Sequence, residues 1–167
     1  EWLHPTEFPS MKGRDVVAID LETCDTDLKK MGPGWPRKVG DVIGIAVSSG
    51  DFTAYYPIAH EGGGNMDRSI IIEYIKEICE DESIQKVFHN AQYDIGWLSV
   101  LNIEVKGYIH DTMIAAALLN ENRYSFTLNS MVSEYLGEFK NESLLKAKAE
   151  ELGLDPKAEM YKLPAEF

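Results

Sequence analysis

Residues 16–24 read VVAIDLETC, an apolar run that ends in two acids. Side chains alternate between the two faces of a strand, so Ile19 and Leu21 are predicted to point inward and Asp20 and Glu22 to share the opposite face. Two neighbouring carboxylates repel each other unless a cation or water compensates them. The pattern therefore indicates either a cation site or an ordinary amphipathic strand whose acids face water.

The bulk composition is typical of one globular domain. The chain has 167 residues, of which 44% are apolar and 26% charged. No apolar run approaches the roughly 20 residues that span a bilayer, and the first residues lack the pattern of a secretory signal. Cys24 and Cys79 stand far apart without zinc-ligand spacing, so we expect free thiols in a reducing cytoplasm and no membrane association.

The net charge of −12 is unusual for a protein that binds nucleic acid, because such proteins usually neutralise phosphates with Lys and Arg. An acidic balance does suit a site that collects divalent cations, which then supply the positive charge locally. Acidity also keeps a domain soluble. Net charge alone therefore does not identify the partner.

The order of the predicted elements indicates an α/β fold. Strands come first as an antiparallel meander and then alternate with helices, which predicts a mixed β-sheet flanked by α-helices. The GPG and WP sequences between the first two strands are expected to exclude regular structure. The predicted strands are 15–21, 42–47, 52–57 and 86–90, and the predicted helices are 67–79 (capped by Asp67), 91–101, 112–119, 127–137 and 142–152.

A second motif, VFHNAQYD at residues 87–94, also places an acid after an apolar strand. Asn90 and Asp94 would lie one helical turn apart on the same face, although Asn90 as a helix cap and Asp94 as a solvated acid would explain them equally well. Acid-x-acid pairs also arise by chance in a chain with 28 acids. Together, however, the two motifs supply the converging carboxylates that two-metal phosphoryl transfer requires.

The sequence resembles the 3′–5′ exonuclease (proofreading) domain of family A DNA polymerases, within the DEDD exonuclease superfamily. The resemblance covers residues 15–140 and implies an RNase H-like fold. The segments that carry it are AIDLET (18–23), HNAQYD (89–94), HDTMIAAALLN (110–120) and SFTLNSMVSEYLG (125–137).

This resemblance implies a metal-dependent exonuclease that removes nucleotides from the 3′ end of single-stranded or frayed DNA. Asp20, Glu22 and Asp94 would be catalytic carboxylates that hold two Mg²⁺ or Mn²⁺ ions. The substrate 3′ end would lie beside the side chains of Thr23, Asn90 and Tyr93. Tyr93 and Phe126 are candidates for stacking on unpaired bases, with core packing as the alternative for Phe126. Asp111 is expected to cap a helix.

One departure from the family concerns its third motif, Tyr-x-x-x-Asp or His-x-x-x-x-Asp, which supplies a fourth carboxylate. Downstream of Asp94 no tyrosine has an aspartate four residues later, and Tyr161 is followed there by Ala165. We therefore expect residues 1–167 to be a single exonuclease domain, C-terminally truncated, with a polymerase domain following in the same chain. The expected location is the cytoplasm of a bacterial or phage-infected cell. The alternatives are an RNase D-like exoribonuclease and a non-catalytic module that binds nucleic acid or protein.

Overall fold

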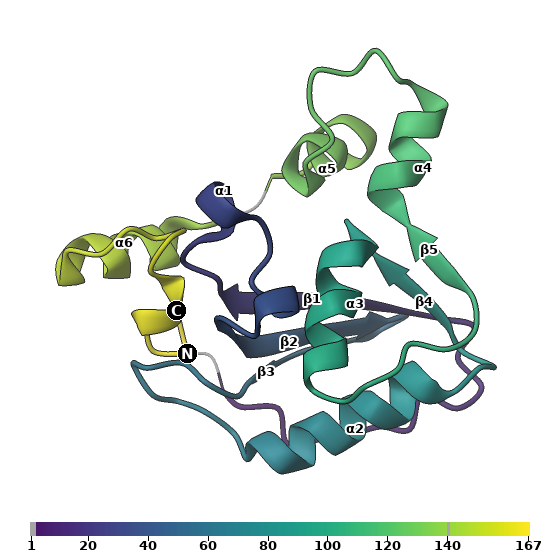
Figure 1. The fold of residues 1–167 in the computed structure, drawn as a ribbon, viewed down its shortest axis with the longest axis horizontal. Helices are drawn as coiled ribbons and strands as arrows, with labels where there is room; N and C mark the ends of the chain where they lie inside the picture. The colour runs from purple at the N-terminus through teal and green to yellow at the C-terminus, as the bar shows by residue number, and fades with distance from the viewer. Residues whose placement is uncertain (1–2, 140) are drawn as a thin grey trace.

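The computed structural model describes residues 3–139 and 141–167, and their centre is a five-stranded mixed sheet (Figure 1). The strand order is β3-β2-β1-β4-β5. The first three strands form the predicted antiparallel meander, and β4 and β5 add in parallel to β1. The strands are β1 (Val16–Cys24), β2 (Asp41–Ser49), β3 (Phe52–Pro57), β4 (Gln85–Phe88) and β5 (Ile109–Asp111).

Helices surround this sheet. Helices α2 and α3 pack on one face, α4 and α5 project at the top of the view in Figure 1, and α6 lies at its left. The helices are α1 (Leu28–Met31), α2 (Arg68–Glu80), α3 (Ala91–Val100), α4 (Thr112–Leu119), α5 (Leu128–Leu136) and α6 (Ser143–Leu152), with the 3₁₀ turns η1 (Trp35–Arg37) and η2 (Met160–Lys162). The predicted α/β fold class is confirmed.

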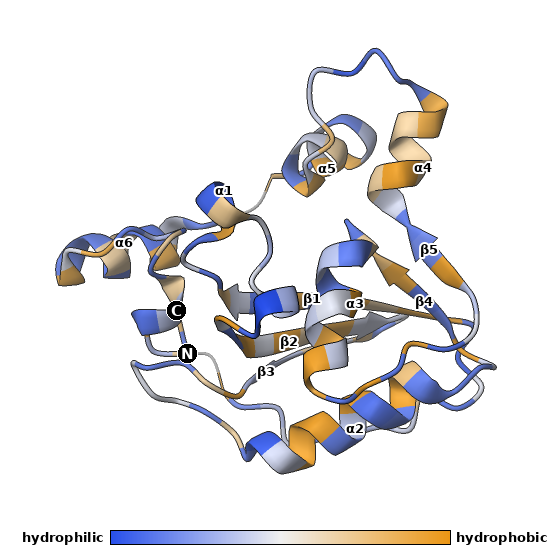
Figure 2. Cartoon of the chain, in the orientation of Figure 1, coloured by the Kyte–Doolittle hydropathy of each residue, from blue (hydrophilic) through white to orange (hydrophobic). Residues whose placement is uncertain are grey.

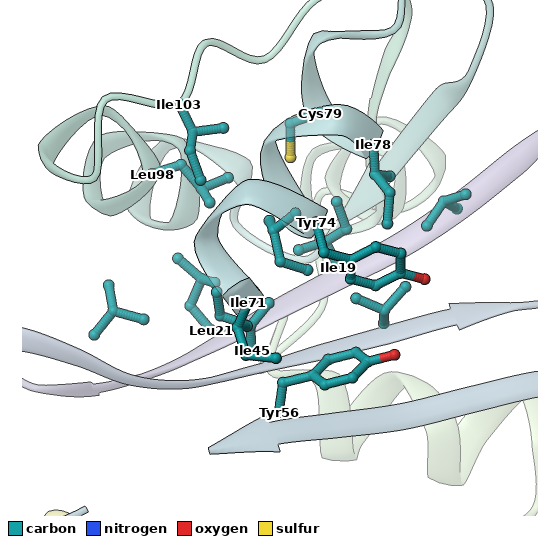
Figure 3. Close-up of a cluster of buried hydrophobic side chains, with 14 of the residues drawn as sticks. Ile19, Leu21, Ile45, Tyr56, Ile71, Tyr74, Ile78, Cys79, Leu98 and Ile103 are labelled. Carbon is teal, nitrogen blue, oxygen red and sulfur yellow. The ribbon is translucent and has the colours of Figure 1, made fainter. Parts of the chain in front are cut away.

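The core lies between the sheet and the two helices α2 and α3. Val17, Ile19 and Leu21 of β1 alternate into it, as the sequence predicts, while Asp20 is exposed on the opposite face. Figure 3 shows how Ile19 and Leu21 meet the apolar side of α2. Figure 2 shows the matching pattern on α2, where hydrophobic and hydrophilic residues alternate around the helix. Burial of these side chains fixes which face of β1 carries the acids.

Two local predictions are wrong. The loop before β2 does contain regular structure, namely α1 and η1, because Pro36 sits at the start of η1, where a missing N–H is tolerated. Residues 109–111 were expected only to lead into a helix but form the edge strand β5, since Lys86 and Val87 of β4 pair with them in register. Tertiary pairing overrides local propensity at such short segments.

The sheet bends where β1 approaches its acidic end. The register between β1 and β2 shifts between Glu22 and Thr23, which pair with Gly44 and Val42 respectively, so that Ile43 is an extra residue on β2. Such a β-bulge increases the local twist and re-aims the neighbouring side chains. The irregularity lies at the carboxyl end of β1, where the candidate site is found. No helix in the described part of the chain is long and apolar enough to cross a membrane.

Candidate active site

The acids meet at the carboxyl end of β1. Strand β4 runs parallel to β1 and leads, through His89 and Asn90, directly into α3. The first turns of α3 therefore lie next to the end of β1, and Asp94 faces the Asp20–Glu22 segment. Carboxyl ends of neighbouring parallel strands are the usual place for sites in α/β sheets.

Asp94 is an acidic residue that is almost completely buried, with only 3% of its surface exposed. Its Oδ1 accepts a hydrogen bond of 3.1 Å from the Leu21 backbone N–H, which fixes the side chain against β1. Burial, followed by the negative charges of Asp20 and Glu22, raises the pKa of Asp94 to about 7. The structure thus brings together the three acids that the sequence analysis selected, two from β1 and one from α3.

The chemistry of this donor set fits a divalent cation. Mg²⁺ prefers carboxylate oxygens and retains several waters, so it needs an open cluster of acids and no closed cage. Within residues 3–139 and 141–167, no three His, Cys, Asp or Glu side chains are arranged closely enough to hold a metal ion by themselves. Asp20 is exposed and Glu22 half-buried, so solvent reaches both of these carboxylates. A cation here would relieve the repulsion that raises the Asp94 pKa.

Thr23 and Tyr93, both predicted to lie at the substrate end, are joined directly. The Tyr93 hydroxyl donates to Asp25 Oδ2 at 3.1 Å, so the contact of 2.7 Å between Thr23 Oγ1 and Tyr93 Oη has Thr23 as its donor. Asp25 Oδ2 also accepts the Gly34 backbone N–H at 2.9 Å. Asp25 was not among the predicted site residues, because its only signal in the sequence is its position just beyond β1.

Asn90 and Tyr93 line a common hollow of about 400 Å³ at the start of α3. Its other wall comes from the segment between β1 and β2, through Leu28, Pro33 and Trp35. Asn90 adopts a left-handed backbone conformation with φ of 72°, and its side chain makes no capping hydrogen bond to α3. Its interpretation as a side-chain helix cap is therefore wrong, and its side chain is left available to this hollow.

Phe126 is held in position by a hydrogen bond to its main-chain carbonyl. Its carbonyl accepts a hydrogen bond from His89 Nε2 at 2.9 Å, and its side chain is half-buried. His89 follows β4 and, with Asp20, lines a second hollow on the uncovered face of the sheet. The loop that carries Phe126 is thus fastened to the second motif, while stacking of its ring on a base stays a prediction.

Tyr55 and His60 are further side chains beside the acids that the sequence analysis did not select. They line a hollow together with Glu22, and the negative charges of Glu22 and Asp20 add to burial in raising the pKa of Tyr55. The signal was present in the predicted hairpin, because alternation places Tyr55 on the same face as Asp20 once the register of the strands is known. Register cannot be read from one sequence with confidence where loops are long.

Asp111 caps two helices with one carboxylate. As expected it accepts the Met113 and Ile114 N–H groups at the start of α4, and it also accepts those of Asn90 and Ala91 at the start of α3. Burial tends to raise the pKa of Asp111, but these four backbone hydrogen bonds outweigh it and lower the pKa. Asp111 thereby holds the helix that carries Asp94.

We expect Asp111→Ala to lower the free energy of unfolding by about 2–3 kcal/mol, more than a single helix cap contributes. Urea denaturation monitored by circular dichroism would measure this loss. Asp67→Ala is the matched control, because Asp67 caps only α2, through Ser69 and Ile70. Equal losses in the two variants would show that the bonds of Asp111 to α3 contribute nothing.

Comparison with known proteins places this geometry in context. Residues 8–159 match the model of the 3′–5′ exonuclease family. The chain is 36% identical to a DNA-directed DNA polymerase of Pseudomonas phage M6 over 173 aligned residues, which is all of this chain and 26% of the phage protein. It is 29% identical to DNA polymerase I of Pseudomonas aeruginosa over 130 residues, or 74% of this chain and 13% of that protein. The chain thus spans about a quarter or less of these curated relatives.

Solved structures support the fold. The Trypanosoma brucei RNase D: GMP complex superposes with a TM-score of 0.64 and 20% identity, covering 93% of this chain and 46% of that chain. At this identity the likeness concerns the architecture: a mixed sheet with flanking helices of the RNase H-like exonuclease type.

Proposed function

Because this chain belongs to the 3′–5′ exonuclease family found in DNA polymerase I-type proteins, we propose that it hydrolyses the terminal phosphodiester at the 3′ end of single-stranded or frayed DNA. The observation that carries the proposal is the carboxylate of Asp94, held against β1 beside Asp20 and Glu22, with its pKa raised by burial and then by the charges of those two acids. Burial of one carboxylate beside two other acids is unfavourable unless a cation compensates its charge.

Asp20, Glu22 and Asp94 are the residues that would hold Mg²⁺ or Mn²⁺, in the proposed two-ion arrangement. Bound there, the ions would lower the pKa of a water molecule and neutralise charge on the phosphate. The protein's own contribution is to hold the acids in place. Leu21 N–H fixes Asp94 by hydrogen bonding, and the apolar neighbours Ile19 and Leu21 fix the direction of Asp20 and Glu22.

The hollow formed by Asn90, Tyr93 and the segment before β2 would take the terminal nucleotide. Leu28 and Trp35 offer apolar and aromatic surface for a base, and unpaired bases are free to stack on such surfaces. Asp25 and Thr23 hold the Tyr93 hydroxyl in one position. Substrate would therefore be recognised by its free end and its exposed base, without a basic groove, which agrees with the net charge of −12.

The direct test is cleavage of 5′-labelled oligonucleotides of the same sequence as single-stranded DNA, duplex DNA and RNA. We expect stepwise shortening of single-stranded DNA from its 3′ end with Mg²⁺ or Mn²⁺, slower shortening of the duplex and none with EDTA. Faster shortening of RNA than of DNA would identify an RNase D-like enzyme. Retained binding of the 3′ end without cleavage, at any metal concentration, would identify a non-catalytic module.

The set of three acids also predicts how much activity residues 1–167 have by themselves. Two ions in a family of this kind share four carboxylates, and the described residues provide three at the site. We expect this chain to bind one Mn²⁺ tightly and to cleave slowly. In the proposed parent protein, further chain would supply the fourth acid and the polymerase domain. Its proposed location is the cytoplasm of a bacterial or phage-infected cell. Isothermal titration with Mn²⁺ would measure the stoichiometry, and two tight sites would show that three acids suffice.

A further inference from the structure

The Tyr55 ring lies on the sheet face that carries the acids. In register, Asp20 of β1 is opposite Ala46 of β2, which in turn is opposite Tyr55 of β3. The phenol passes over Gly44, since a Cβ atom on Gly44 would collide with the Tyr55 hydroxyl, and Gly44 is directly opposite Glu22. Tyr55 thus reaches across β2 to a position beside Glu22.

His60 fixes the direction of the Tyr55 hydroxyl. A carbonyl can only accept, so the contact of 3.1 Å between His60 Nδ1 and the Leu163 carbonyl requires a proton on Nδ1. In the neutral imidazole Nε2 is then the acceptor, and the Tyr55 hydroxyl donates a hydrogen bond to it at 2.7 Å. Burial lowers the pKa of His60, which favours the neutral ring, and the residue is 7% exposed. The Asn65 side chain holds the His60 backbone by two hydrogen bonds: it accepts from the His60 N–H and donates to the His60 carbonyl.

The partner of His60 belongs to a segment that is distant in sequence, which we name the clamped segment (residues 161–165). It is fastened to the loop after β3 by two more hydrogen bonds, from Glu61 N–H to the Tyr161 carbonyl at 2.8 Å and from Ala165 N–H to the Gly63 carbonyl at 3.1 Å. A side chain at position 62 would collide with the backbone of Pro164, so only glycine fits there. The loop after β3 is therefore shaped to receive the clamped segment.

These groups meet Glu22 in a hollow of about 290 Å³. Glu22, Tyr55 and His60 form one side of it, and Leu163, Pro164 and Ala165 are among the residues that form the other. The position of the clamped segment thus determines the shape of the space next to Glu22.

We propose that Tyr55 and His60 are positioning residues, which lock the clamped segment onto the sheet and thereby fix the wall of the metal site beside Glu22. The proposal rests on the proposed function of the acids and extends it to residues that contact no ion. His60 acts through two hydrogen bonds at opposite ring nitrogens, so both ends of the link depend on one tautomer. Loss of either bond would loosen the wall while leaving the acids themselves in place.

The first measurement concerns the link itself. Hydrogen–deuterium exchange of peptides covering residues 161–167 should be about tenfold faster in His60→Leu than in the unsubstituted protein, because the bonds that protect Ala165 N–H open more often. Exchange in β1 and β2 should not change. His60→Gln should restore protection, since its amide can donate to the Leu163 carbonyl and accept from Tyr55. His110→Leu, on exposed β5, is the matched control for loss of an imidazole.

The second measurement concerns the metal site. Titration with Mn²⁺, followed by the electron paramagnetic resonance of the free ion, should show about tenfold weaker binding in His60→Leu and Tyr55→Phe, as for other groups that support metal ligands from behind. His60→Gln and the exposed-tyrosine control Tyr124→Phe should bind as the unsubstituted protein does. Tyr55→Phe removes one oxygen atom only, so it tests the link even if His60→Leu fails to fold.

Failure of this inference differs from failure of the proposed function. Unchanged exchange of residues 161–167 in His60→Leu, or unchanged Mn²⁺ affinity beside faster exchange, would overturn the positioning role while the metal site stands. Absence of Mn²⁺ binding by the unsubstituted protein would overturn the metal site and, with it, the role of the pair at that site.

Discussion

Asp94→Asn is expected to abolish metal-dependent shortening of DNA 3′ ends while leaving the fold intact. The substitution removes one negative charge from the three-acid cluster but retains an oxygen that can accept from Leu21 N–H. A ligand that stabilises a bound metal and its activated water contributes several kcal/mol to the transition state, so the rate should fall by about a thousandfold or more. Rates of 3′ shortening with saturating Mg²⁺ and with Mn²⁺, before and after substitution, would measure this.

The control for this experiment is Asp51→Asn. Asp51 is a surface acid that directly precedes β3, and it forms an ion pair with Arg14, which precedes β1. It lies outside the three-acid cluster. Its loss changes the net charge by the same amount, so a general effect of charge would appear in both variants. Unchanged cleavage by Asp94→Asn would end the assignment of Asp94 as a catalytic carboxylate, whatever the family.

The parts of this site that the sequence predicts are those set by local rules. Alternation along β1 sends Ile19 and Leu21 into the core and therefore Asp20 and Glu22 to the other face. The strand-to-helix passage at Asn90 places Asp94 in the first turn of α3. Both follow from spacing within one element, and the structure confirms both.

The parts that the sequence does not predict depend on contacts between distant segments. Tyr55 approaches Glu22 only because two strand pairings put β3 in a particular register. Asp111 caps α3 as well as α4 because β5 pairs beside β4, and β5 is too short to be recognised by propensity. His60 binds a carbonyl 103 residues away. Such contacts are fixed by packing of the whole domain and leave no periodic trace in the sequence.

The stability of the metal-free protein should fall as pH rises, and Asp94 should be the cause. The pKa of Asp94 in the folded protein is about 7, against 3.8 for the ordinary side chain, so between these values the folded state binds a proton that the unfolded chain releases. Stability decreases with pH wherever the folded state binds more protons than the unfolded state. The penalty is absent below about pH 3.8, grows through this window and is complete above about pH 7.

Its full size above pH 7 is on the order of 4 kcal/mol, from about 1.4 kcal/mol for each tenfold change in proton affinity. Asp94→Asn cannot ionise, so it should be as stable as the unsubstituted protein near pH 4 and several kcal/mol more stable at pH 8. Urea denaturation of both proteins in EDTA across this range would measure the difference, in which the titration of groups that do not interact with Asp94 cancels. Mn²⁺ at pH 8 should stabilise the unsubstituted protein and leave Asp94→Asn nearly unaffected, because the ion replaces the proton as the partner of the buried charge. A difference that stays constant with pH would show that Asp94 is ionised without strain in the folded protein, and the case for a cation in this cluster would lose its physical basis.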